Sequence, residues 1–191
     1  MLRSNTSNES DEEIVKKIQA GDTESVGVLI ERYEGKIKRY AKKFLSLAED
    51  IDDIVQEIFI KVYTNIKSFD VDKKFSSWIY RIAHNELINI LKKKQKNPLS
   101  FFDPDVLFPH PIAKESADGN IREKEIRKNL DQCLDKLPPK YRETLLLYYL
   151  EELDYKEIAD IIHIPVSTVG VRLKRGRKLL RNVCKNLGID Y

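Results

Sequence analysis

The sequence is poor in the features that mark secreted and membrane-spanning proteins. It has two cysteines, Cys133 and Cys184, which lie within apolar helical patterns and form no CxxC pair. We therefore expect both to be small buried hydrophobes in a reducing compartment, although their spacing leaves a disulfide open. No run approaches the roughly 20 apolar residues that cross a bilayer, and residues 1–13 lack the apolar core of a leader segment. These absences predict a cytoplasmic protein with no membrane insertion of its own.

Motifs of catalysis and metal binding are also missing. The three histidines, His84, His110 and His163, are scattered and have no Cys, Asp or Glu partners at ligand spacing. No GxSxG, Walker or GxGxxG pattern is present. We therefore expect no enzymatic activity, no metal site and no cofactor.

Charge is nearly balanced overall but strongly segregated along the chain. Its 34 basic and 31 acidic residues leave a net charge of +3. Residues 166–187 contain no acid, whereas residues 44–60 contain five acids and no base. Segregation of this kind indicates that the two segments face partners of different charge.

The acid-free segment follows a helix–turn–helix pattern. Asp154 can cap a first helix with apolar residues at helical spacing, Pro165 ends that helix, and a second helix can start near Ser167. Two short helices joined by a tight turn present the second one to the DNA major groove. An ordinary hairpin with a solvated basic face is the alternative. The coincidence of the basic run with this spacing favours DNA binding.

Amphipathic helical patterns cover most of the chain, so we expect an all-α fold. Four segments are predicted: a polar tail (1–9), a helical domain (10–97), a Pro-containing linker (98–121) and a second helical domain with the helix–turn–helix (122–191). The linker contains Phe101, Phe102 and Phe108, which are too apolar for a solvated coil. We expect it to lie against another surface.

Two stretches of the first domain suggest binding surfaces. Apolar residues of segment 51–62 form an inward stripe that leaves Asp53, Gln56 and Glu57 facing outward, which suits protein docking. Favourable charge at a helix N-terminus is the alternative explanation. In segment 75–96, aromatic, amide and basic residues are interleaved, as suits single-stranded nucleic acid. For Trp78 in that segment we expect a core position.

Four motifs in order give the chain a family resemblance. DIDDIVQEIFIKVY, FSSWIYRIAHNELINILKKK, LPPKYRETLLLYYLEELDYKEIADIIHIP and STVGVRLKRGRKLLR resemble a bacterial RNA polymerase sigma factor of the extracytoplasmic-function (ECF) group of the sigma-70 family. The resemblance covers essentially the whole chain after the tail. It implies a sigma-2 domain that binds the clamp of core polymerase and melts the minus-ten element, and a sigma-4 domain that reads duplex minus-thirty-five DNA. It also implies contact with the polymerase flap, a linker near the active-site cleft, association with the nucleoid in holoenzyme and control by an anti-sigma factor.

The resemblance assigns residues to each of these tasks. Polymerase docking is assigned to Asp53, Gln56 and Glu57. The minus-ten element is assigned to Lys73, Lys74, Phe75, Ser76, Tyr80, Arg81, His84, Asn85 and Asn89. The minus-thirty-five element is assigned to Ser167, Thr168, Val171, Arg172, Lys174, Arg175, Arg177 and Lys178.

Several positions depart from the family pattern. His84, Asn89 and Ile90 stand where relatives often have Arg, Asp and Tyr, so the promoter sequence does not follow from the resemblance. Gly170 and Val171 replace a frequent Lys-Ser pair, which removes two polar side chains near DNA. His163 stands where Gly is usual in the turn, at a position that calls for positive φ.

Two functional hypotheses remain open on sequence alone. One is a dissociable promoter-specificity subunit, and the other is a stand-alone helix–turn–helix regulator whose first domain senses a signal or dimerises. Because the apolar linker has no evident partner, we also expect the free chain to be held inactive. Either its own two domains pack together or an anti-sigma partner covers its polymerase and nucleic-acid faces.

Overall fold

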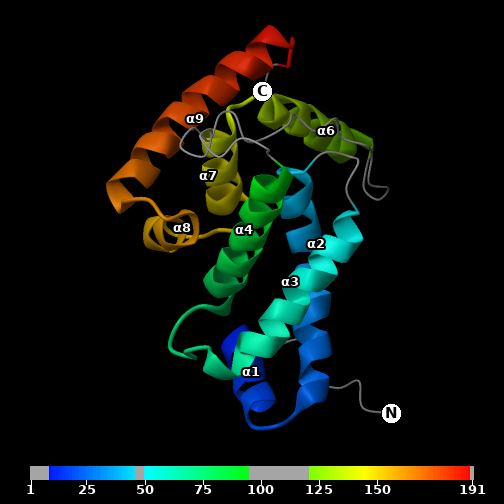
Figure 1. Cartoon of the computed structure of the whole chain (residues 1–191). Helices are drawn as coiled ribbons and strands as arrows, with labels where there is room; N and C mark the ends of the chain where they lie inside the picture. The colour runs from blue at the N-terminus through cyan, green and yellow to red at the C-terminus, as the bar shows by residue number, and fades with distance from the viewer. Residues whose placement is uncertain (1–8, 46–49, 95–120, 190–191) are drawn as a thin grey trace.

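The computed structural model describes residues 9–45, 50–94 and 121–189, and within them it contains helices and no strand (Figure 1). The all-α prediction is confirmed, whereas the predicted linker lies almost entirely outside the described residues. The α-helices are α1 (Asp11–Gln19), α2 (Val26–Lys42), α3 (Ile51–Asn65), α4 (Phe75–Lys94), α6 (Ile121–Asp135), α7 (Pro139–Tyr149), α8 (Tyr155–Ile162) and α9 (Val166–Asn186), with 3-10 turns at Thr23–Ser25 and Ile66–Ser68.

Helices α1 to α4 form an N-terminal bundle in which side-chain caps fix the starts of α1 and α3. Ser10 and Glu13 form a reciprocal capping box at α1. Asp50 caps α3 by accepting from the backbone N–H groups of Asp52 and Asp53. The inner faces of α2, α3 and α4 then meet in one core. Its buried residues include Leu29, Tyr33, Ile37, Ile58, Val62, Ile79, Ala83 and Leu87.

Helices α6 to α9 form the C-terminal half, in which α9 crosses α7 closely. Gly176 of α9 is buried at the crossing, where an added Cβ would lie 3.2 Å from Leu145 Cδ1 and 3.4 Å from Tyr141 Cβ. A glycine therefore lets the backbone of the basic helix approach α7. Because α7 also contacts the N-terminal bundle, this crossing sets the position of α9 in the whole molecule.

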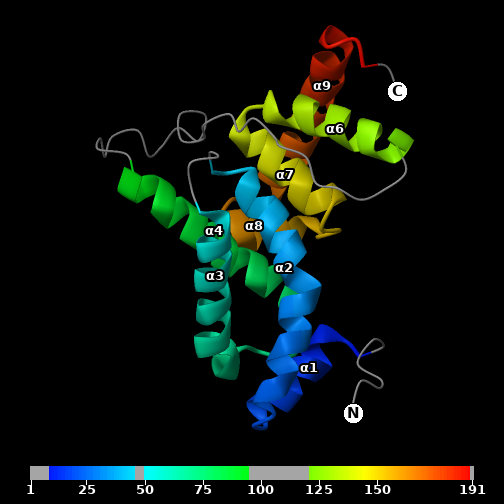
Figure 2. The same ribbon diagram turned by 90° about the vertical axis from the view of Figure 1, so that its right-hand side faces the viewer.

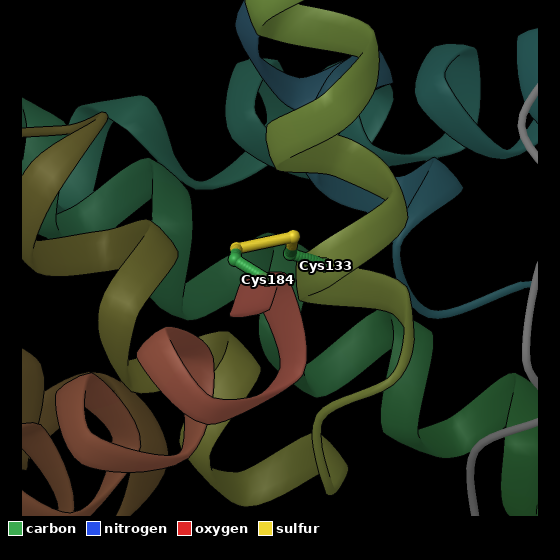
Figure 3. The surroundings of a disulfide bond; sticks show 2 residues. All are labelled: Cys133 and Cys184. Carbon is green, nitrogen blue, oxygen red and sulfur yellow. A yellow bond between two sulfur atoms is a disulfide. The ribbon is translucent and has the colours of Figure 1, made fainter. Parts of the chain in front are cut away.

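A disulfide between Cys133 and Cys184 joins α6 to the C-terminal end of α9 (Figure 3). Their Cα atoms are 5.4 Å apart and both residues are buried. Burial of both cysteines was predicted correctly, but the expectation of two unpaired thiols is corrected. The sequence reading missed the pair because 51 residues separate the two positions, and spacing of that kind carries no information on proximity.

The C-terminal half packs directly on the end of the N-terminal bundle where α2 ends, with α8 lying beside α4 (Figures 1 and 2). Arg142 of α7 is 1% exposed and donates to the carbonyl oxygen of Lys43 at 3.0 Å and to that of Leu137 at 3.2 Å. Burial lowers the pKa of Arg142, and the carboxylate of Asp135 opposes that shift. The guanidinium thus ties the end of α2 to the end of α6.

The close crossing at Gly176 predicts a position-specific loss of stability. Gly176→Val places a branched side chain against Leu145 and should lower the free energy of unfolding by about 1–3 kcal/mol, because the core there has no room for it. Gly27→Val is the matched control, since an added Cβ at Gly27 meets nothing within 4 Å. Urea titration followed by circular dichroism measures both. Equal stability of the two variants would contradict a tight α7–α9 crossing.

Candidate polymerase and nucleic-acid interfaces

Helix α3 presents an acidic outer face. Asp53, Gln56 and Glu57 are all exposed, while Val55 and Ile58 between them are buried. The predicted outward orientation is confirmed, and a role in docking remains a prediction. Capping does not account for this face, because Asp50 already caps the helix and Gln56 and Glu57 lie beyond the first turn.

Two exposed hydrophobic residues extend this face along α3. Ile60 is 55% and Tyr63 is 48% exposed, and both follow the acidic residues at helical spacing. Sequence reasoning missed them, although positions three and six residues after Glu57 carry the signal. We name the surface formed by Asp53, Gln56, Glu57, Ile60 and Tyr63 the α3 face. Exposed acids next to exposed apolar side chains on one helix face suit a protein-docking surface.

A polar pocket of about 320 Å³ lies between α3 and α4. Three predicted minus-ten residues, Arg81, Asn85 and Asn89, line it together with residues that the sequence did not single out for this role. Guanidinium, amide and carboxylate groups in one recess can hydrogen-bond the edge of an unstacked base. The additional lining residues are Lys61, Asn65, Ser68, Trp78, Ile82 and Glu86.

Trp78 combines the expected core position with a place in this pocket. Its ring packs on Phe69 at a centroid distance of 5.0 Å and on Phe75 at 5.7 Å, while its remaining surface is partly exposed. Glu86 is buried in the pocket wall and pairs with Lys61. The pocket therefore has one aromatic wall and one wall with a paired charge.

Other predicted minus-ten residues are buried rather than presented to solvent. Phe75 lies in the core of the N-terminal bundle against Tyr33, and its backbone N–H donates to Glu12 at 2.8 Å. Tyr80 is buried edge-on against Tyr40, and burial followed by the carboxylate of Glu151 raises the pKa of Tyr80 above its usual range. His84 is also buried.

The partners of the buried and basic residues come mostly from the C-terminal half. His84 Nδ1 lies 2.7 Å from Glu143 Oε1 of α7, and Lys74 Nζ lies 3.2 Å from Glu157 Oε1 of α8. Lys73 and Phe75 are exceptions, since the ammonium of Lys73 pairs with nearby Asp70 at 3.6 Å and Phe75 contacts Tyr33 and Glu12. Ser76 is half-buried at the start of α4. The structure thus divides the predicted minus-ten residues between an open pocket and a covered surface.

The predicted helix–turn–helix is present as α8, a short turn and α9. Asp154 and Glu157 form a capping box at α8, and His163 adopts the left-handed conformation (φ 55°, ψ 48°) predicted from its place in the turn. Helix α9 starts at Val166, one residue before the predicted start. An added Cβ at Gly170 would lie 3.4 Å from the ring of Tyr155, an ordinary van der Waals contact, so packing does not require glycine there.

Helix α9 lies at the outer edge of the molecule (Figure 1). Most of its basic residues are exposed. Val169, Leu173 and Gly176 are buried, while Val171 is 47% exposed. Thr168 and Arg172 are half-buried beside the exposed cations. Arg177 donates to the hydroxyl of Tyr149 at 3.3 Å. The exposed predicted residues are Ser167, Val171, Lys174, Arg175, Arg177 and Lys178.

The described part of the chain contains neither a metal-binding cluster nor a membrane-spanning helix. No group of three or more His, Cys, Asp or Glu side chains is placed to hold a metal ion among these residues. No helix within the same ranges is long and apolar enough to cross a bilayer.

Comparison with known proteins identifies the family. The sequence pattern of Sigma-70 region 2 matches residues 29–97, and that of Sigma-70 region 4 matches residues 127–180. The ECF RNA polymerase sigma factor SigW of Bacillus subtilis (strain 168) is 36% identical over 91% of this chain and 96% of its own. The ECF RNA polymerase sigma-E factor of Haemophilus influenzae (strain ATCC 51907 / DSM 11121 / KW20 / Rd) is 30% identical over 91% of this chain and 94% of its own.

A solved structure shares the fold. The sigma factor RpoE of Bartonella quintana, in complex with the anti-sigma factor NepR, has a TM-score of 0.66 at 21% identity, covering 83% of this chain and 96% of its own. The sequence relatives, which extend over nine-tenths of the chain, decide the family. The chain belongs to the ECF RNA polymerase sigma factors.

Proposed function

We propose that this chain is a promoter-specificity subunit that binds core RNA polymerase through the α3 face and DNA through α4 and α9. The observation that carries the proposal is the charge segregation on one folded chain. An exposed acidic face on α3 repels DNA and suits a protein, whereas the acid-free α9 of a helix–turn–helix suits phosphates and base edges. A stand-alone regulator binds its operator without polymerase, so it has no need of the exposed acidic α3 face.

The two halves divide the work. Residues 10–97 act as a sigma-2 domain that docks on the clamp and captures unpaired minus-ten bases, and residues 122–191 act as a sigma-4 domain that reads the minus-thirty-five duplex beside the flap. Residues 98–121 connect them. The chain has no enzymatic activity of its own and works on the nucleoid as part of holoenzyme in the cytoplasm. The complex of the Bartonella quintana factor with NepR supports control of this chain by an anti-sigma factor.

Run-off transcription over a genomic fragment library tests this function. Core polymerase with this chain should initiate at a dedicated set of fragments that core polymerase alone does not use. A gel-shift comparison separates the alternative, because a stand-alone regulator binds its duplex without polymerase. Tight and specific duplex binding by the chain alone, together with no transcription in the presence of core enzyme, would refute the proposal.

The α3 face yields a docking prediction. Reversing Asp53 and Glu57 to Lys should weaken binding to core polymerase about tenfold or more, because like charges placed across an interface repel. The matched control reverses Glu31 and Glu34, two exposed acids of α2 outside the α3 face. Co-purification with core enzyme and circular dichroism measure binding and folding. If the α2 reversal weakens binding as much as the α3 reversal, docking depends on net charge and not on this face.

The pocket between α3 and α4 yields a prediction for promoter melting. Arg81→Ala and Asn89→Ala each remove a donor that lines the pocket and should reduce capture of an unpaired base by about 1–3 kcal/mol. Permanganate reactivity of promoter thymines reports the melted state in holoenzyme. Initial duplex binding should change little. Melting equal to that of the parent in both variants would show that the pocket holds no base.

Helix α9 yields a prediction about which of its residues set the base preference and which set the overall affinity for DNA. Residues near the N-terminus of a recognition helix reach base edges, and those further along meet phosphates. Arg172→Ala should therefore cost about 1–3 kcal/mol and relax preference at one base pair. Lys178→Ala should weaken all sites alike and reduce the salt dependence by about one phosphate.

Holoenzyme binding to all single-base variants of the minus-thirty-five element, at two salt concentrations, measures this division. The exposed side chain of Val171 can contact a thymine methyl, which adds a second position of preference. A Lys178→Ala variant with altered base preference, beside an Arg172→Ala variant with unaltered preference, would reverse the assignment.

A further inference from the structure

The contact between α8 and α4 is built on the carboxylate of Glu157. Glu157 Oε1 accepts from Ser77 Oγ at 2.8 Å and pairs with Lys74 Nζ at 3.2 Å. Its other oxygen, Oε2, accepts from the backbone N–H of Asp154 at 2.7 Å, so both oxygens are used. The carboxylate lies beside the first turn of α4, where the helix dipole favours an anion. This is the environment in which a DNA phosphate would bind.

The same helix pair is joined at a second point further along α4. His163, at the end of α8, places Nε2 3.2 Å from Asn85 Oδ1, and its ring centroid lies 6.2 Å from that of His84. Lys74, Ser77 and Asn85 together span about three turns of one α4 surface. Two of these three are among the residues assigned to the minus-ten element.

Buried polar contacts at the centre hold the two halves in register. Glu143 of α7 accepts from the hydroxyl of Tyr40 at 2.7 Å and lies 2.7 Å from His84 Nδ1. Lys43, at the end of α2, pairs with two acids of α6, with Asp131 at 2.8 Å and with Asp135 at 3.1 Å. At these points, acids of the C-terminal half meet donors of the N-terminal half.

We propose that in the free chain α8 occupies part of the minus-ten surface of α4, with the Glu157 carboxylate in the position that a DNA phosphate takes in the transcribing complex. The proposal rests on the proposed function in one respect, namely that this surface of α4 binds unpaired promoter DNA. Glu157 and a phosphate cannot both occupy the position beside Lys74 and Ser77, so docking of α8 and capture of the unpaired strand exclude each other. Polymerase docking that draws the C-terminal half away exposes the surface.

The polar character of the contact makes it reversible. Its ion pairs and hydrogen bonds join polar side chains that water satisfies when the halves separate, and inter-domain contacts with this polar content open more readily than purely apolar ones. The basic face of α9 lies outside the contact and is exposed in the closed chain. Closure therefore occupies the position beside Lys74 and Ser77 and engages the Asn85 amide, but it leaves the duplex-reading surface accessible.

Two substitutions open the contact without altering any residue assigned to DNA or polymerase. Glu143→Ala removes the acceptor shared by Tyr40 and His84, which find water in the open chain. His163→Gly removes the contact to Asn85 and suits the left-handed backbone at that position. Asp160→Ala, an exposed carboxylate of α8 outside the contact, is the matched control.

Single-strand affinity of the full chain is the main measurement. Loss of hydrogen bonds to a buried charged group should raise the open population about tenfold or more, and apparent affinity rises in proportion to the competent population. A fluorescent pool of random-sequence single-stranded 12-mers should therefore bind about tenfold more tightly to Glu143→Ala, and measurably more tightly to His163→Gly. Asp160→Ala should match the parent. Binding of a random duplex pool through α9 should be equal in all four proteins.

Hydrogen exchange of α4 and α8 amides measures opening without reference to DNA. Faster exchange in the two contact variants, with the control unchanged, is the expected result. Folded variants with exchange and single-strand affinity equal to the parent would overturn the proposal. So would faster exchange with unchanged single-strand affinity, because the contact would then exist without masking the surface. A chain that fails to support transcription with core polymerase would refute the proposed function and leave the exchange result standing.

Discussion

Two adjacent residues of α7, Arg142 and Glu143, hold the halves of the molecule together through buried polar contacts. Taking a cation and an anion out of water is costly, and the cost is offset only when each finds partners. Arg142 donates to backbone carbonyls at the ends of α2 and α6, and Glu143 accepts from Tyr40. Burial followed by the Glu143 carboxylate raises the pKa of Tyr40 well above its usual range. Tyr40 therefore keeps its proton and remains a donor to Glu143.

This arrangement explains why the two halves meet with a defined geometry. Buried polar partners specify one register, since a small displacement leaves a charge unpaired. Apolar packing does not stop at the boundary, because the buried hydrophobic residues of both halves form one continuous cluster from Ile14 to Leu173. The polar contacts of Arg142 and Glu143 therefore act together with this shared core in placing one half on the other.

Local chemistry made several features predictable from sequence. The capping residues Ser10 and Asp154, the outward phase of Gln56 and the left-handed turn at His163 depend on neighbours within a few positions. Those neighbours are visible in the sequence, and the structure confirms each of them. The burial of Cys133 and Cys184 was also predictable, because apolar periodicity shows that a residue faces inward.

Contacts between distant segments were not predictable in the same way. The family resemblance assigned Tyr80 and His84 to the minus-ten element, but both are buried, and their neighbours Glu151 and Glu143 are about 60–70 residues further along the chain. A single sequence carries no signal for that proximity, and it left the Cys133–Cys184 disulfide open for the same reason. The prediction of an inactive free chain was based on the apolar linker, and it left open whether the two domains pack together or an anti-sigma partner covers them. Only the structure shows which residues of the two halves are in contact.

Asn85 links the pocket to the contact between the halves. Its side chain lines the pocket between α3 and α4 and also reaches His163 of α8. An unpaired base that hydrogen-bonds Asn85 therefore competes with His163 for the same amide. Since a ligand shifts an equilibrium only by its differential affinity for the two states, this competition gives the single strand a direct means of favouring the open chain. Opening begun by polymerase is then reinforced by the base that fills the pocket, which couples promoter melting to release of α8.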